Sequence, residues 1–430
     1  MNDHLTPAVL PQPLQQFDQA FHALALSPRW DLLGLPRHHF PALRRLVLGL
    51  LLGAKSIRAA WVQSQPYCVE QAIQALYDCL DDPRVDLAAL LRALTPGHRT
   101  TEQDLLLIDD TVTRSYGEHI AGVTWQHDHN SKAEFWGHNV VLLYHRSPQG
   151  PERFVDLAVK MNTHQPESQI QPGRPPKTIR QARRKKWQLA LDLVRTAKAR
   201  GHRADVLLCD AGYAHTDFLR ELVTAGLHFV TRLPSNRAIG LGLTAKQWLA
   251  GKRSYKRLRG TGYYFAQTYA WLAGVGFVKL VAYWPCHTRA GKDRGRFLVT
   301  DQLRLSAYEV VTQYLRRWGI EPAIHEARQA GGLDEGHVRG WHNVGNYYAL
   351  ALVAHAVAAE MHRQTAPAQL GVVGYIQQWR QDLHAARVSA TQRARAELFK
   401  TKLWQHGFST RSADHRRLLE LVDAAFLNTG

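Results

Sequence analysis

Two short apolar runs, each ending in acids, constrain the fold of this chain more than any other feature. L-L-L-I-D-D occupies residues 105–110, and D-V-L-L-C-D occupies residues 205–210. A short, continuous apolar run bounded by polar residues is typical of a strand that is buried on both faces of a sheet. The two runs therefore predict an α/β core in which two strands end in aspartate.

The segments around these runs alternate between strand and helix patterns. The run at 105–110 is followed by strand patterns at 136–145 and 153–161, which the turn S-P-Q-G joins into an antiparallel meander. The patterns that follow are a helix at 187–199, a strand at 205–210, a helix at 216–226 and a strand at 228–234. The predicted order is β-β-β-α-β-α-β.

Helical patterns flank this core, and a further segment interrupts it. Residues 1–100 carry apolar residues at helical spacing, at 14–26, 42–64 and 69–80. We predict a helical N-terminal domain over 1–100 that binds DNA, a catalytic core over 101–233 and 297–350, a β-rich insertion over 234–296, and a helical region over 351–430. Residues 296–301 read as the strand that leads back from the insertion into the core.

The charge of the chain points to a polyanionic partner. The 54 lysines and arginines exceed the 36 acids, which gives a net charge of +18 and a pI near 9.9. Nucleic acid is the simplest partner for such a protein, with a ribosome-like or membrane-surface role as the alternative. No apolar run reaches the roughly 18 residues that a membrane span needs. The scattered cysteines and the absence of a signal-peptide pattern lead us to expect a cytoplasmic, nucleoid-associated protein.

A polar edge marks the stretch Y-L-R-R-W-G-I-E-P-A-I-H-E-A-R at 314–328. Its residues Tyr314, Arg317, Glu321 and Arg328 fall within roughly 60° of one another on a straight α-helix. They can therefore form one wall of a site, or simply a solvated helix face. Pro322 directly follows Glu321 and can bend the helix.

These patterns together predict a site formed by three carboxylates. Asp110 and Asp210 end neighbouring strands, about 5 Å apart, and a helix packed on that edge brings Glu321 to them. Three oxygen ligands without cysteine suit Mg²⁺ or Mn²⁺. Two such ions would activate water or a DNA 3′-hydroxyl for attack on a phosphodiester. Tyr314, Arg317 and Arg328 would then contact phosphates.

The chain resembles bacterial insertion-sequence transposases of the DDE type, which have an RNase H-like catalytic core. The narrower resemblance is to the cut-and-paste group whose signature is Tyr, two residues, Arg, three residues, Glu, six residues, then Lys or Arg; the residues at 314, 317, 321 and 328 fit it. An acid followed by Thr in I-D-D-T-V-T-R-S-Y points to Asp110, and V-L-L-C-D-A-G-Y points to Asp210. The choice of Asp110 over Asp109 rests on that Asp-Thr step, because successive strand residues point to opposite faces.

The resemblance implies an α/β protein with an RNase H-like mixed sheet, a β-rich insertion, and N- and C-terminal helical regions. It implies a DNA transposase that cleaves and joins transposon ends by two-metal-ion phosphoryl transfer with Mg²⁺ or Mn²⁺. The protein would bind double-stranded DNA, transposon ends and target, as a homodimer. The alternatives are a domesticated metal-dependent DNA endonuclease and a catalytically silent DNA-binding regulator. Trp271 and Trp284 in the insertion are expected in its core, with base stacking as the alternative.

Overall fold

The computed structural model describes residues 11–405, apart from 96, 98–99, 115–119, 128–133, 161–183, 241, 253, 286–294, 336–337, 339 and 366–369. The chain divides into two compact units. One comprises residues 26–356 and holds the sheet; the other comprises residues 1–25 and 357–430. Within the described part, no helix is both long enough and apolar enough to cross a membrane.

Short helices precede the sheet in the larger unit. They are α2 (Leu26–Leu32), η1 (Arg37–His39), α3 (Phe40–Leu51), α4 (Ile57–Ser64), η2 (Gln65–Tyr67), α5 (Ile73–Asp81) and α6 (Leu87–Leu94). The single helix expected over 42–64 is wrong, because the chain forms α3 and α4 instead. Gly53 has a φ of +89°, which ends the first helix, and the Ser56 side chain caps the second by accepting the Ala59 N–H at 3.0 Å.

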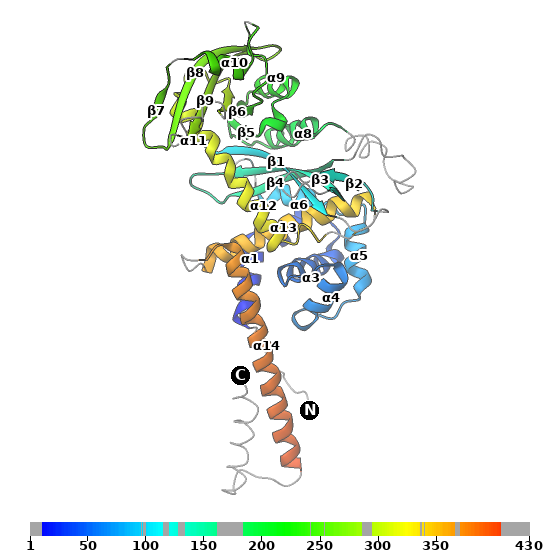
Figure 1. Cartoon of the computed structure of the whole chain (residues 1–430). Helices are drawn as coiled ribbons and strands as arrows, with labels where there is room; N and C mark the ends of the chain where they lie inside the picture. Colours follow the sequence, from blue (N-terminus) through cyan, green and yellow to red (C-terminus); the bar gives the residue numbers. More distant parts are fainter. Residues whose placement is uncertain are drawn as a thin grey trace. The chain divides into compact units, whose positions relative to one another are not determined.

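One mixed sheet of ten strands forms the centre of the larger unit (Figure 1). Its strands are β1 (Leu105–Arg114), β2 (Thr124–His127), β3 (Glu134–Arg146), β4 (Arg153–Lys160), β5 (Val206–Cys209), β6 (His228–Leu233), β7 (Lys256–Leu258), β8 (Tyr263–Leu272), β9 (Gly276–Pro285) and β10 (Arg296–Thr300). The order is β2-β3-β1-β5-β6-β10-β9-β8-β7, with β4 also on β3. The expected antiparallel meander is present as β1, β3 and β4, to which β2 adds a strand that we did not predict.

Strand β1 differs from its prediction in length. It continues past the two aspartates through Thr111, Val112 and Thr113, which pair with β3. On its other edge the parallel pairing with β5 stops at Ile108 and Cys209. Asp110 therefore lies within β1 and not at its end, and the two acids lie where β1 loses one of its two neighbours.

Helices cover both faces of the sheet. Leu106, Ile108 and Cys209 belong to the core that packs against α8 (Lys186–Ala199), α9 (Thr216–Thr224) and α10 (Ala245–Gly251). The opposite face packs against α11 (Ala307–Leu315) and α12 (Ile320–Gln329). Because strand residues alternate between faces, Asp109 lies on the α12 face and Asp110 on the α8 face.

The segment expected as one straight helix is broken. The 3₁₀ turn η7 (Arg316–Gly319) separates α11 from α12. The Arg316 carbonyl at the start of this turn accepts the Arg146 Nη1 at 2.7 Å. Pro322 lies in the first turn of α12, where a missing N–H costs little. The bend therefore precedes Pro322 rather than following it.

The segment 234–296 continues the sheet. Strand β10 pairs with β6 on one edge and with β9 on the other, and β8 and β7 follow outward. Trp284 is buried in the core formed with α10, as expected. The core position expected for Trp271 is wrong, because Trp271 is 51% exposed and packs against Phe277. A base-stacking role for Trp271 stays a prediction.

The described part of the smaller unit is helical, and the domain boundary expected at residue 351 stays a prediction. The unit contains α1 (Gln12–Ala23), the end of α13 (Trp341–Thr365) and α14 (Val372–Gln405). Helices α1 and α14 pack together, and the Trp379 indole donates to the Pro13 carbonyl at 2.7 Å. The beginning of α13 belongs to the larger unit, where the Asn346 side chain binds the backbone of Leu80, Val85 and Leu87.

Close packing at Gly49 yields a testable prediction for the fold. A Cβ on Gly49 would lie 2.4 Å from the Ala60 Cβ and 2.6 Å from its Cα, so α3 and α4 would have to separate. We expect Gly49→Ala to lower the free energy of unfolding by about 1–3 kcal/mol, although alanine favours helices. Gly345→Ala in α13, which meets open space, should be neutral or stabilising. Urea unfolding of both variants checks this, and equal stability would contradict it.

Candidate active site

The register of the parallel strands brings two acids together. Ile108 is paired with Cys209, so the next residues, Asp109 within β1 and Asp210 directly after β5, lie at the same level. Both point away from the face that carries Ile108 and Cys209, because side chains alternate along a strand. The sheet therefore presents Asp109 and Asp210 side by side, on the face where α11 and α12 lie.

Arg317 links Asp109 to Glu321. Its Nη1 donates to Asp109 Oδ2 at 2.7 Å, and its Nη2 donates to Glu321 Oε1 at 2.7 Å. The guanidinium is buried, the Asp109 carboxyl is 16% exposed and the Glu321 carboxyl is 55% exposed. One buried cation thus connects a β1 carboxylate with the carboxylate of α12.

The electrostatics confirm that acids converge here. Burial raises the pKa of Asp109 to about 7, against the opposing effect of Arg317, and the charges of Asp210 and Asp110 raise it further. Burial and the neighbouring acids thus favour the protonated form of Asp109, and Arg317 favours its charged form. A bound cation would favour the charged form.

Asp110 has a different set of partners on the α8 face. Its Oδ1 accepts from Lys186 Nζ at 2.6 Å and from the Tyr213 hydroxyl at 3.2 Å, and its Oδ2 accepts from Asn139 Nδ2 at 2.7 Å. Lys186 begins α8, and its ammonium lies 4.7 Å from the centre of the Tyr213 ring. Both carboxylate oxygens of Asp110 are thus satisfied by neighbouring side chains.

Asp210 caps the 3₁₀ turn η5 (Ala211–Tyr213) at the end of β5. Its Oδ1 accepts the Gly212 N–H at 2.8 Å. A Cβ on Gly212 would lie 3.1 Å from that oxygen and 3.2 Å from Lys186 Nζ. Glycine at 212 therefore leaves room for the Asp210 carboxylate and the Lys186 ammonium to approach the same backbone.

The predicted phosphate-contacting residues have structural partners. Tyr314 is buried, and the Arg317 guanidinium carbon lies 5.7 Å from its ring centre. Arg328 donates to the Thr111 hydroxyl and, at 2.9 Å, to the Val112 carbonyl, and it pairs with Asp334. Tyr314 and Arg328 thus fix Arg317 and the end of α12 to the sheet. Their DNA contacts stay predictions.

The three acids do not form a closed metal cage. Among the described residues, the group whose ligand atoms lie within 4.8 Å of one another is His38, His39 and Asp82. That group is remote from the acids in sequence, and Arg84 already occupies its carboxylate, with Nη2 at 2.6 Å from Asp82 Oδ2. At the sheet face, Arg317 stands between Asp109 and Glu321. Cation binding there requires Arg317 or the exposed Glu321 to move.

Sequence reasoning missed several residues around the acids. Asn139, Lys186 and Tyr213 are spread over β3, α8 and η5, and only the folded sheet brings them to Asp110. The pairing of Asp109 with Arg317 could have been inferred from the alternation of β1 once the core-facing residues were known. In the sequence, the Asp-Thr step of the family motif favoured Asp110 over Asp109.

An RNase H-like mixed sheet, with acids on the neighbouring strands β1 and β5 and a glutamate helix on one face, defines a nuclease of the DDE class. Comparison with protein families agrees: the DDE superfamily endonuclease family matches residues 35–291, more than half of the chain. The chain belongs to this family, which makes it a nuclease-type enzyme and implies a DNA substrate. No curated protein matches the chain. The family match includes Asp109, Asp110 and Asp210, and it ends before Tyr314.

The role of Arg317 yields a prediction about pH. The folded protein keeps the Asp109 proton up to about pH 7, whereas an unfolded carboxyl loses it near 3.8, so the stabilising effect of protonation is lost as pH rises through 7. Without Arg317, the charged carboxylate would be buried unpaired. We expect Arg317→Gln to lower the free energy of unfolding by about 3 kcal/mol at pH 8.5 and by less at pH 5.5.

Urea unfolding in EDTA at the two pH values measures this difference. Arg316→Gln changes an exposed neighbouring arginine and is the matched control, for which we expect little change at either pH. Asp109→Asn combined with Arg317→Gln should remove most of the pH-dependent loss. A loss for Arg317→Gln that is the same at both pH values would contradict a charge-compensating role.

Proposed function

We propose that the protein is a DNA transposase that cleaves and joins the ends of its own element. The observation that carries this proposal is the convergence of Asp109, Asp210 and Glu321 on one face of the sheet, with Arg317 between the first and the last. Membership of the DDE superfamily endonucleases and the net charge of +18 agree with a DNA substrate. The match of residues 314–328 to the Tyr-Arg-Glu-Arg signature supports transposition over simple cleavage.

The donor set suits a divalent cation. Carboxylate oxygens without cysteine or histidine favour Mg²⁺ or Mn²⁺. Burial, and after it the charges of Asp210 and Asp110, raise the pKa of Asp109, and a bound cation would oppose this shift. Two bound ions would activate the attacking oxygen and stabilise the leaving oxygen of the phosphodiester. The carboxylates would hold these ions, and Arg317 would be displaced from at least one acid towards the DNA phosphates.

Either Asp109 or Asp110 could be the carboxylate that β1 contributes to this set of ligands. Resemblance favours Asp110, because of the Asp-Thr step. The contacts support Asp109, because it faces Arg317 and Glu321 while both oxygens of Asp110 bind Lys186, Tyr213 and Asn139. We therefore propose that Asp109 holds the cation and that Asp110 positions Lys186 and Tyr213 behind it.

Cleavage of a DNA fragment carrying the transposon ends, with Mg²⁺ or Mn²⁺, tests the carboxylate set. We expect Asp109→Asn, Asp210→Asn and Glu321→Gln each to lose roughly 10²-fold or more of the cleavage rate, because each removes a ligand. Asp110→Asn should retain measurable cleavage. Asp217→Asn removes an exposed acid on α9 and is the matched control. If Asp109→Asn were fully active and Asp110→Asn inactive, the cation ligand from β1 would be Asp110 and not Asp109.

The same reaction separates the three candidate functions. Cleavage followed by joining to a target plasmid supports the transposase, which we expect to act as a homodimer on two ends. Cleavage without joining supports a domesticated endonuclease. DNA binding without metal and without cleavage supports a catalytically silent regulator.

A further inference from the structure

Two histidines and an aspartate meet among the short helices that precede the sheet. His38 and His39 belong to η1, and Asp82 directly follows α5. His39 Nε2 lies 3.1 Å from Asp82 Oδ2, and the ring centres of the two histidines are 4.1 Å apart. One ligand atom from each of the three residues lies within 4.8 Å of the other two. The group thus offers two imidazole nitrogens and a carboxylate oxygen to a common centre.

The local fold holds two of these residues in place. His39 is 5% exposed, and the Cys79 thiol donates to its carbonyl at 3.7 Å, which joins η1 to α5. The Oδ1 atom of Asp82 accepts the Arg84 backbone N–H at 2.9 Å and so fixes the carboxylate at the start of a turn. His38 is exposed, so its ring can adjust to a bound ion. Two ligands are therefore positioned in advance, which lowers the cost of ordering a binding site.

The recess around these three residues carries negative charge. It has a volume of about 570 Å³, and two further acids, Asp78 and Asp81, line it together with Asp82. Three carboxylates against one arginine, Arg84, leave an excess of negative charge there when the histidines are neutral. The chain as a whole carries a net charge of +18, so this recess attracts cations against the overall charge of the protein.

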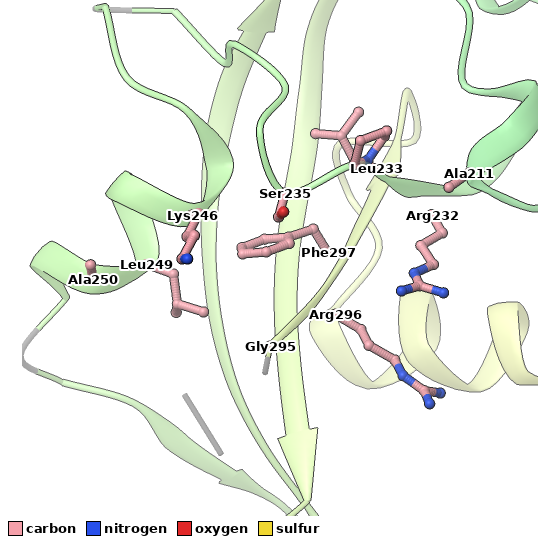
Figure 2. Close-up of a pocket in the computed structure, with 11 residues that line it drawn as sticks. Ala211, Arg232, Leu233, Ser235, Lys246, Leu249, Ala250, Gly295, Arg296 and Phe297 are labelled. Atoms are coloured by element: carbon pink, nitrogen blue, oxygen red, sulfur yellow. The ribbon is translucent and has the colours of Figure 1, made fainter. Parts of the chain in front are cut away.

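The pocket between the end of β6, the start of β10 and α10 shows the contrast. Its charged lining residues are Arg232, Lys246 and Arg296, and none of the described residues that line it is an acid or a histidine (Figure 2). That lining offers a metal ion neither an imidazole nor a carboxylate. Of these two hollows, the recess at η1 is therefore the one with the ligands for a metal cation.

We propose that His38, His39 and Asp82 bind a divalent transition-metal ion of the Zn²⁺ class, with water completing its coordination. Imidazole nitrogens favour Zn²⁺ and similar ions over Mg²⁺. Ligand atoms of one tetrahedral Zn²⁺ lie about 3.4 Å apart, and His39 Nε2 and Asp82 Oδ2 are 3.1 Å apart. A ligating nitrogen carries no proton, so the neutral His39 ring would keep its single proton on Nδ1. This site is separate from the acids of the sheet and goes beyond the proposed function.

Arg84 is the competitor for this site. Its Nη2 donates to Asp82 Oδ2 at 2.6 Å, and its side chain is 68% exposed. An exposed ion pair contributes little to stability, so the guanidinium can move into solvent when an ion binds. The ion would then join η1, which precedes α3, to the end of α5 and stabilise these helices against unfolding.

Calorimetric titration of the full chain with Zn²⁺, in excess Mg²⁺ to compete at the sheet acids, tests this site. We expect His38→Ala and Asp82→Asn each to weaken Zn²⁺ binding at least roughly tenfold, because each removes a ligand. Arg84→Gln should tighten it roughly two- to fivefold, because it removes the competing cation. His384→Ala removes an exposed histidine of α14 and is the matched control, for which we expect unchanged binding.

Thermal unfolding with and without Zn²⁺ gives a second readout. Wild type and Arg84→Gln should gain stability from Zn²⁺, and His38→Ala should lose that gain while folding normally, because His38 is exposed. Equal Zn²⁺ binding in wild type and His38→Ala overturns the assignment, as does weaker binding in Arg84→Gln or an equal loss in His384→Ala. None of these measurements uses DNA, so they decide the metal site separately from the transposase activity.

Discussion

The ion-pair bridge from Asp109 through Arg317 to Glu321 is the interaction on which the candidate site depends. It joins an inner strand of the sheet to a helix more than 200 residues later in the chain, through a guanidinium that is buried at the Asp109 end. A buried carboxylate is costly unless a cation compensates it. In this structure Arg317 compensates the charges of Asp109 and Glu321, and under the proposed function these acids would become cation ligands when Arg317 gives way.

The break between α11 and α12 makes this bridge possible. On a straight helix, the residues of the Tyr-Arg-Glu-Arg signature would project from one continuous face. In the folded chain, η7 separates them, so that Tyr314 packs under Arg317 while Glu321 begins α12. Arg146 binds the Arg316 carbonyl at the start of η7, and its Nη1 would lie 2.2 Å from a Cβ on Gly319. Glycine at this turn lets a sheet residue stabilise the bend.

Much of the fold could be predicted from local patterns, and the exceptions have physical causes. The buried strands and helices from residue 136 to residue 234 agree with the predictions to within a few residues, because their apolar runs and turns are strong local signals. The length of β1 could not be predicted from its apolar run, because Thr111 and Thr113 join the strand only by pairing with β3. The helix over 42–64 was predicted as one element because its apolar residues outweighed a single glycine with positive φ.

The sequence indicated which types of residue form the candidate site, but it could not decide between Asp109 and Asp110. Residue types and spacing identified Asp210, Glu321 and Arg317, but the choice between Asp109 and Asp110 depends on which face of β1 packs against α8. The orientation of β1 is a property of the tertiary structure, because it is set by the packing of Leu106 and Ile108 against α8 and α9. The partners of Asp110 come from three separate elements, and no local pattern connects them.

The extension of the sheet beyond β6 gives the acids a neighbouring surface. Because β10 is paired with β6 on one side and β9 on the other, the segment 234–296 is built onto the edge of the core, and its position is fixed by backbone hydrogen bonds. A separate, loosely linked insertion could not hold Arg296 in a fixed relation to Asp210. Hydrogen-bonded pairing can, since each strand is held about 4.8 Å from the next. The long interval between Asp210 and Glu321 thus contains strands that extend the sheet before the chain returns with the glutamate.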